Sequence, residues 1–422
     1  MVLRKKAMIY GLIALAGFSL VLLFVGLDNS VIIEALADDP GAVETIAEEE
    51  EKIVDPNADA PKQAQLENPP RVVKAIYATG WSAGSEGRVQ YFIDLINSTE
   101  LNAIVIDIKD YSGILSYEPE VAAVKQIGAF EKRVAKINAL IQRLHEQNIY
   151  VIGRISIFQD PALAEARPEL AVKSAASGEL WRDYKKLSWM DSASQEVWDY
   201  NIAIARDALE RGFDEVNFDY IRFPSDGPIS DIAYPFFDTT GLKHEAIARF
   251  FAYARKELVG EKISADLFGE VSYARGDIGV GQVLEDAFGQ FDAIAPMTYP
   301  SHYAKGFIGL VNPAEHPYEV VKYSIDGALS RIRDFDLKTQ PSTDASGTLQ
   351  APQIQLAEYE VLPTIRPWLQ DFDLGADYTA DMVRAQIQAV EDSAAFYGEQ
   401  YYSGWMIWSP SNVYTAGAFR AE

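Results

Sequence analysis

The chain of 422 residues contains no cysteine. This absence excludes disulfide bonds, thiolate nucleophiles and cysteine-based zinc sites. Histidine is also scarce: four residues, His145, His244, His302 and His316, and none has a metal-ligand spacing such as H-E-x-x-H. We therefore expect no metal and no cofactor. The same scarcity argues against a Ser-His-Asp hydrolase and against a metal-dependent amidase.

Positive charge is in short supply as well. The 37 Lys and Arg face 62 Asp and Glu, which gives a net charge of −25 and a pI near 4.6. Phosphate binding needs clustered Lys and Arg, so a nucleic-acid partner is not expected. A neutral substrate fits this composition more easily.

Only the N-terminus carries a long apolar run. Residues Ala7 to Leu27 contain no charged side chain, and Arg4, Lys5 and Lys6 precede them. About 20 apolar residues span a bilayer, and the basic residues stay on the cytoplasmic side. The run is long for a cleaved signal peptide, so residues 1–28 are predicted to be a signal-anchor, with the rest of the chain outside the cytoplasm. Cleavage near Ala37, after an A-x-A sequence, is the alternative and would release a secreted protein.

Residues 29–70 follow as an acidic, proline-containing segment. It includes the run Glu48 to Glu51 and ends in Pro69 and Pro70. Its apolar content is too low for a core of its own. We expect a disordered linker between the membrane and a globular domain at residues 71–422.

From Arg71 onward, short apolar runs alternate with helix-period segments. This alternation is typical of a parallel sheet with helices between its strands. Eight such runs end at a polar or aromatic residue, which predicts a (β/α)₈ TIM barrel. The predicted strands lie at 72–78, 103–108, 150–157, 214–219, 262–267, 293–297, 361–366 and 402–408.

The stretch 214–224 organises the candidate site. Asn217 and Asp219 alternate with apolar residues, and Asp219, Tyr220 and Arg222 crowd the strand end. In a TIM barrel the chemistry lies at the carboxyl ends of the strands. A structural Asp–Arg pair would give the same local pattern, but the other strands end in a similar way.

We expect these strand ends to converge on one face of the barrel. Aromatic faces stack on sugar rings, and glycoside hydrolysis needs two carboxyl groups at one bond. Asp219 and Glu270 are the predicted catalytic pair, with Asp266 as an alternative second carboxylate. Since Trp405 and Trp408 face opposite sides of a strand, at least one can be plain core. The predicted substrate-binding residues are Trp81, Asp107, Lys109, Arg154, Tyr220, Arg222, Asp266, Tyr299, Trp368, Asp371, Trp405 and Trp408.

Several of these motifs together resemble a known family. They are Gly80-Trp81, Ile106 to Asp110, Asn217 to Pro224, Pro296 to Pro300, Pro367 to Asp371 and Gly404 to Trp408. The combination is similar to the putative glycosyl hydrolase family known as domain of unknown function 4015. This resemblance covers about residues 72 to 408 and implies a TIM barrel and a glycoside hydrolase activity.

Two established families suggest roles by position. In alpha-amylase-like barrels an Asp after strand four, a Glu after strand five and an Asp after strand seven act together, and Asp219, Glu270 and Asp371 look like these three. Chitinase-like family-18 barrels carry a Glu on strand four where this chain has Ile221. That departure argues against their mechanism here unless Glu270 supplies the acid.

The sequence thus predicts a membrane-tethered glycoside hydrolase that acts on a polysaccharide or a cell-surface glycan by a two-carboxylate mechanism. A non-catalytic barrel that binds carbohydrate or cell wall is the alternative. It would keep the aromatic residues, with its carboxylates pointing away from one another.

Overall fold

The computed structural model describes residues 58–343 and 348–421. Across these two ranges, no helix has the length and apolar character needed to cross a bilayer. The predicted signal-anchor at Ala7 to Leu27 lies outside the described residues.

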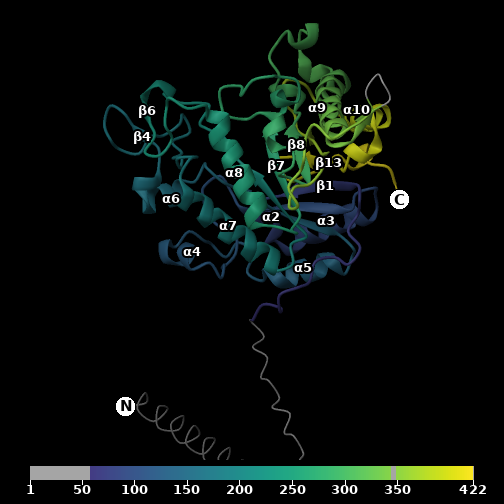
Figure 1. Ribbon diagram of the computed structural model, residues 1–422. Coiled ribbons are helices and arrows are strands. Elements are labelled where there is room, and N and C mark those ends of the chain that lie inside the picture. The colour runs from purple at the N-terminus through teal and green to yellow at the C-terminus, as the bar shows by residue number, and fades with distance from the viewer. Residues whose placement is uncertain (1–57, 344–347, 422) are drawn as a thin grey trace, which may run out of the picture. The chain divides into compact units, whose positions relative to one another are not determined.

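Parallel strands close into a barrel, as predicted (Figure 1). In order around it, they are β1 (Val73–Ala78), β2 (Ala103–Lys109), β3 (Tyr150–Ser156), β5 (Glu215–Asp219), β7 (Ile263–Phe268), β8 (Ala293–Met297), β11 (Thr364–Ile365) with β12 (Trp368–Gln370), and β13 (Gly404–Trp408). The seam is the parallel pair β1 and β13, where Val73 lies opposite Gly404. Gly404 has a φ of 114°, and a Cβ there would lie 1.8 Å from the Val73 carbonyl oxygen. The seam therefore requires glycine at this position.

The seventh strand position is interrupted by Pro367. β11 pairs with β8, whereas β12 pairs with both β8 and β13. Proline donates no backbone hydrogen bond, so the ladder breaks where it enters the sheet. The sequence predicted a continuous strand at 361–366, and the residues that complete this part of the barrel lie beyond that range, at Trp368–Gln370.

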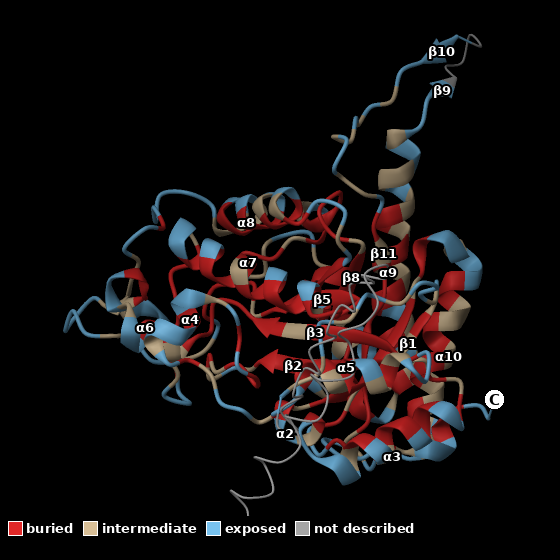
Figure 2. Ribbon diagram, turned by 90° about the horizontal axis from the view of Figure 1, so that it is seen from below, coloured by how far each residue is buried: buried red, intermediate tan, exposed pale blue. Residues whose placement is uncertain are grey.

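Helices surround the barrel and turn their apolar sides to it, as the burial colours in Figure 2 show. Serine, threonine or aspartate side chains cap the ends of some of them; Thr379, for example, accepts a hydrogen bond from the Met382 amide at the start of α10. The helices are α2 (Gly80–Ala83), α3 (Glu86–Asn97), α4 (Ala122–Ile127), α5 (Ile137–His145), α6 (Pro161–Ala166), α7 (Gln195–Glu210), α8 (Lys243–Glu257), α9 (Pro317–Thr339) and α10 (Ala380–Tyr397).

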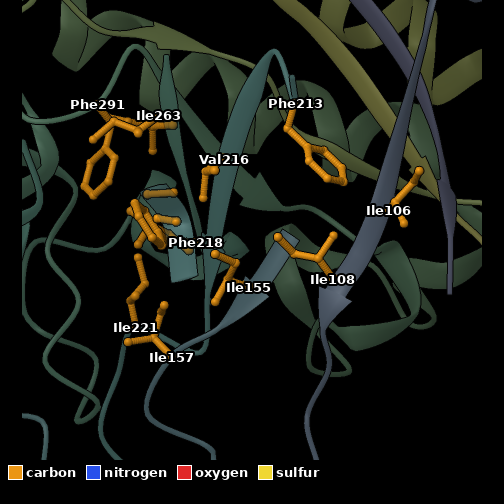
Figure 3. Packing of buried hydrophobic residues seen from close by; sticks show 14 of the residues in the cluster. Ile106, Ile108, Ile155, Ile157, Phe213, Val216, Phe218, Ile221, Ile263 and Phe291 are labelled. Atoms are coloured by element: carbon orange, nitrogen blue, oxygen red, sulfur yellow. The ribbon is translucent and has the colours of Figure 1, made fainter. Parts of the chain in front are cut away.

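Strand alternation divides the core in two. On β5, Val216 and Phe218 point outward into the large cluster under the helices, part of which Figure 3 shows. The smaller cluster fills the barrel and includes Ala75, Val105 and Met406. Side chains that alternate with the outer cluster therefore face the barrel interior, and those nearest the carboxyl ends are polar.

Short two-stranded sheets lie in the connections. β4 (Lys173–Ser174) pairs with β6 (Ile232–Ala233), which ties the long connection after β3 to the one after β5. β9 (Ser342–Thr343) pairs with β10 (Leu349–Gln350) in a hairpin that projects beyond α9 (Figure 2).

Residues 58–70, which composition assigned to the linker, contact the barrel. The Asp59 carboxylate accepts hydrogen bonds from the Asn138 and Ala139 amides at 2.9 and 3.0 Å and so caps α5. The Leu66 amide donates to the Asp214 carboxylate at 2.7 Å, and the Leu66 side chain packs against the inner cluster. Residue composition does not predict this contact between residues 58–70 and the barrel, because the contact depends on individual polar groups and one leucine.

Candidate active site

A cavity of about 830 Å³ opens at the carboxyl ends of the barrel strands. Tyr77, Asp107, Arg154, Asp219 and Trp408 reach it from five strands around the barrel. Its lining is completed by Thr79, Tyr111, Lys185, Tyr220, Arg222, Asp266, Phe268, Gly269, Glu270, Tyr273, Met297, Tyr299, His302, Tyr303, Ala304, Phe307, Trp368 and Pro410. Carboxylates and aromatic rings thus meet in one hollow, as the barrel prediction required.

Arg154 joins three carboxylates at the floor of the cavity. Its Nη1 donates to Asp107 Oδ1 at 2.5 Å, its Nη2 pairs with Asp219, and its Nε lies 3.4 Å from Asp266 Oδ2. Burial lowers the pKa of the Arg154 guanidinium, but the charges of Asp107 and Asp219 raise it further, so the net shift is upward. One cation therefore fixes three acids from neighbouring strands.

Asp219 is held on both of its oxygens. Oδ2 pairs with Arg154, and Oδ1 accepts a hydrogen bond from the Tyr220 amide at 2.5 Å. Tyr220 has a φ of 52°, in the left-handed region that an aromatic residue rarely adopts. Such strain persists where the surroundings enforce it, and here it turns the Tyr220 amide back onto the carboxylate.

Asp266 lies inside the barrel at the base of the cavity. Its Oδ1 accepts hydrogen bonds from Trp368 Nε1 at 2.7 Å and from Asn217 Nδ2 at 2.8 Å. Burial, together with the charge of Asp219, raises the pKa of Asp266 to about 7. At neutral pH this carboxyl group therefore holds a proton for a substantial part of the time.

Glu270 stands on the cavity wall in the turn Gly269–Ser272 that follows β7. It is exposed, and its carboxylate makes no hydrogen bond or ion pair with another residue of the described ranges. The turn lies close against β8, because a Cβ on Gly269 would be 2.5 Å from the Met297 carbonyl oxygen. That close approach fixes the backbone position from which the Glu270 side chain extends.

Aromatic rings form the remaining walls. Beside Glu270, the rings of Tyr273 and Tyr303 lie 5.1 and 4.7 Å from that of Phe307. Across the cavity, Tyr299 and Trp408 pack at 5.2 Å between ring centroids. Flat apolar faces bordered by carboxylates are suited to binding sugar rings.

Comparison with known proteins places the chain. Residues 75–414 match the model of domain of unknown function 4015, the putative glycosyl hydrolase domain. The chain belongs to this family. Membership supports a glycosidase-like function, and the enzyme class predicted from the sequence stands. No curated protein sequence matches the chain.

Solved structures similar to this glycosyl hydrolase domain include three that span different sources. A hypothetical protein from Ruminiclostridium thermocellum is 46% identical over 45% of this chain and 96% of its own, with a TM-score of 0.42. An alpha-galactosidase from Thermus thermophilus is 13% identical over 82% and 60%, with a TM-score of 0.46. The glycoside hydrolase domain of PelA from Pseudomonas aeruginosa is 13% identical over 84% and 98%, with a TM-score of 0.40.

The glycosyl hydrolase domain brings most of the predicted site residues to the cavity. The two predicted catalytic residues, Asp219 and Glu270, both line it. With them are Asp107, Arg154, Tyr220, Arg222, Asp266, Tyr299, Trp368 and Trp408.

Lys109 is not among the lining residues. A register shift between Asp107 and Lys109 in the pairing with β3 interrupts the alternation of β2. The Lys109 side chain is fully buried, where its Nζ pairs with Asp160 at 2.6 Å and donates to Asn201 Oδ1 at 2.8 Å. A β-bulge of this kind leaves no trace in residue type, so the sequence could not reveal it.

Three other predicted residues also lie outside the cavity lining. Trp405 is buried in the outer cluster and stacks on Phe419, since its alternation with Trp408 turns it toward the helices. Asp371 accepts hydrogen bonds from the amide and hydroxyl of Thr415, both at 2.7 Å. Trp81 is exposed, with the Arg133 guanidinium 5.0 Å from its ring.

Some lining residues were not singled out from the sequence. Tyr77 lies at the inward position of β1, and its hydroxyl donates to Asp107 Oδ2 at 2.5 Å. Strand alternation alone could have identified it. Tyr273, Tyr303 and Phe307 come from irregular connections, where no periodic pattern indicates direction.

Proposed function

We propose that the protein hydrolyses glycosidic bonds in a polysaccharide or cell-surface glycan, with Asp219 and Glu270 as the two essential carboxylates. One observation carries the proposal: both residues line the same cavity, one fixed by a cation and the other unpaired among the described residues. Glycoside hydrolysis needs this division between an oriented carboxylate and a carboxyl group that exchanges protons.

Asp219 suits the role of nucleophile or electrostatic stabiliser. Arg154 and the Tyr220 amide keep its oxygens in place, so little reorganisation is needed when positive charge develops on the sugar. Glu270 suits the acid/base role, since its carboxylate is open to the cavity and to water. Asp107, Arg222 and Tyr299 would orient hydroxyl groups, while Trp368 and Trp408 form the apolar surface beneath the ring.

Asp266 is the competing second carboxylate. Its raised pKa would let it donate a proton near neutral pH, but Trp368 and Asn217 already occupy its Oδ1. Leaving-group dependence separates the two assignments. An acid variant retains activity on aryl glycosides with activated leaving groups, because those bonds break without protonation.

The experiment begins with a hydrolysis screen of the full chain on a panel of polysaccharides and aryl glycosides. Asp219→Asn should lower kcat at least about 100-fold on every substrate. Glu270→Gln should lower it similarly on polysaccharides but much less on a dinitrophenyl glycoside. If Asp266→Asn shows that selective retention and Glu270→Gln does not, Asp266 is the acid. If the wild type binds a glycan that it never cleaves, the protein is a carbohydrate-binding barrel instead.

We also propose that the domain acts outside the cytoplasm, tethered by residues 1–28. The uncharged run Ala7 to Leu27 behind Arg4, Lys5 and Lys6 supports this location. Protease added to intact cells should then remove the domain. Full protection of the domain in intact cells, with cleavage only after lysis, would contradict it.

A further inference from the structure

Arg222 is a buried cation with no acidic partner. Its exposed fraction is 9%, and none of the ion pairs in the described ranges includes it. Nη1 donates to the Phe223 carbonyl at 3.1 Å and to Ser225 Oγ at 3.0 Å, while Nε and Nη2 donate to none of the described residues. Buried charges are ordinarily paired, so this guanidinium stands out beside Arg154, which holds three carboxylates.

Three aromatic rings position Arg222. The centre of its guanidinium lies 4.7 Å from the ring centroid of Phe268, 4.8 Å from that of Trp189 and 5.4 Å from that of Tyr220. Such rings hold the planar group in one orientation without using its N–H donors. The donors thus stay available at the cavity that Arg222 lines.

The acids near Arg222 leave its charge uncompensated. Asp219 is committed to Arg154 and the Tyr220 amide, and Asp183 accepts from the Leu187 amide and Trp189 Nε1. Asp226 acts on Arg222 only at a distance. Burial lowers the pKa of Arg222, and these charges offset that effect only in part. In Arg154 the balance is reversed.

A second cation lies on the same cavity. Lys185 is exposed, lines the cavity and forms no ion pair with another described residue. It belongs to the connection of residues 157–194 between β3 and α7, which also supplies Trp189. That connection is long for a barrel, and it supplies both a cation of the cavity lining and a ring that lies against Arg222.

We propose that Arg222 and Lys185 bind a carboxylate of the glycan, so that the substrate is an acidic polysaccharide containing uronic acid units. The inference rests on the proposed function and names its substrate class. A planar carboxylate matches the two parallel donors of a guanidinium, and the interaction is strongest where water is excluded. The strongly negative composition favoured a neutral substrate, but the cavity places an unpaired cation where the glycan would lie.

Binding is the decisive readout. Oligogalacturonate, oligoalginate and a glucuronate-bearing xylan are titrated into the full chain carrying Asp219→Asn, which prevents turnover, alongside the same glycans after reduction of their carboxyl groups to alcohols. At least one acidic glycan should bind. Adding Arg222→Met should weaken that binding about tenfold to a hundredfold, and it should weaken binding of the reduced form much less.

Lys185 supplies a variant that is safe for folding because its side chain is exposed. Lys185→Met should weaken binding of the acidic glycan a few-fold. The difference in affinity between this variant and its parent should shrink as the salt concentration rises. The matched control is Lys186→Met, also exposed but not on the cavity lining, which should bind as the parent does. Thermal unfolding checks that Arg222→Met is folded, and Arg222→Lys should recover part of the affinity.

Three results would overturn the inference: equal affinity for acidic and reduced glycans, affinity unaffected by Arg222→Met, or no acidic glycan bound. Tighter binding of a sulfated glycan without uronic acid units would contradict the carboxylate assignment and indicate that these cations bind sulfate. Cleavage of neutral glycans alone would refute this inference and support the proposed hydrolase function. Arg222-dependent binding of acidic glycans without any cleavage would support the inference and refute the hydrolase function.

Discussion

Asp266→Asn tests the electrostatics of the cavity through stability. The pKa of the wild-type carboxyl is raised from 3.8 to about 7 in the folded protein. The folded state then holds a proton that the unfolded state has released, so wild-type stability falls as the pH rises from about 4 to about 7. A difference of about three pKa units corresponds to at most about 4 kcal/mol at about 1.36 kcal/mol per unit.

The variant removes this penalty and keeps the two hydrogen bonds to Oδ1, while the 3.4 Å contact between Oδ2 and Arg154 Nε is lost. An asparagine oxygen can accept from Trp368 Nε1 and Asn217 Nδ2 as the carboxylate does. Because asparagine does not titrate, the stability of the variant relative to the wild type should increase by about 3 kcal/mol between pH 5 and pH 8.

Urea unfolding of both proteins, followed by tryptophan fluorescence at pH 5, 6, 7 and 8, measures this difference. Asp238→Asn is the control: hydrogen bonds from Thr240 lower the pKa of this exposed carboxyl, so its contribution changes only below about pH 4. A difference for Asp266→Asn that is flat from pH 5 to pH 8 would refute the description of a desolvated carboxyl beside the Asp219 charge.

Two further predictions concern parts of the chain outside the cavity. Trp405→Ala should lower the free energy of unfolding by about 3–5 kcal/mol because it empties a buried site. Trp81→Ala, at an exposed site, should change that free energy by no more than about 0.5 kcal/mol. Urea unfolding of both variants measures the two effects, and losses of similar size would contradict the prediction. Asp59→Ala removes the acceptor for two amides at the start of α5 and should cost about 1 kcal/mol, an effect that Asp59→Asn should largely avoid; unchanged stability of the alanine variant would show that the contact contributes nothing.

The barrel was predictable because the apolar periodicity and the residues that end each strand agree along the chain. Each inward polar residue near a strand end, such as Asn217 and Asp219, alternates with apolar residues that face the helices. The ends of parallel strands meet on one face, so residues far apart in sequence could be assigned to one site.

The sequence did not predict which way the side chains point wherever the regular alternation of a strand stops. Lys109 follows a bulge, and Pro367 divides the seventh strand position. Neither changes the apolar pattern by more than one residue, yet each changes which side a residue faces. The sequence did not predict that Arg154 joins three carboxylates, because carboxylates on three different strands share no local pattern.

The seam between β1 and β13 has a consequence for how the chain folds. Val73 pairs with Gly404, and Tyr414 hydrogen-bonds to the backbone of Tyr77, so the first strand of the barrel finds its second neighbour only near the end of the described chain. Pairings of such separation are slow to form, because a very long loop must close first. Until then β1 has an open edge, which can pair with another chain. Barrel closure is therefore the step at which a nascent chain is most exposed to aggregation, and a truncation before Gly404 would make that exposure permanent.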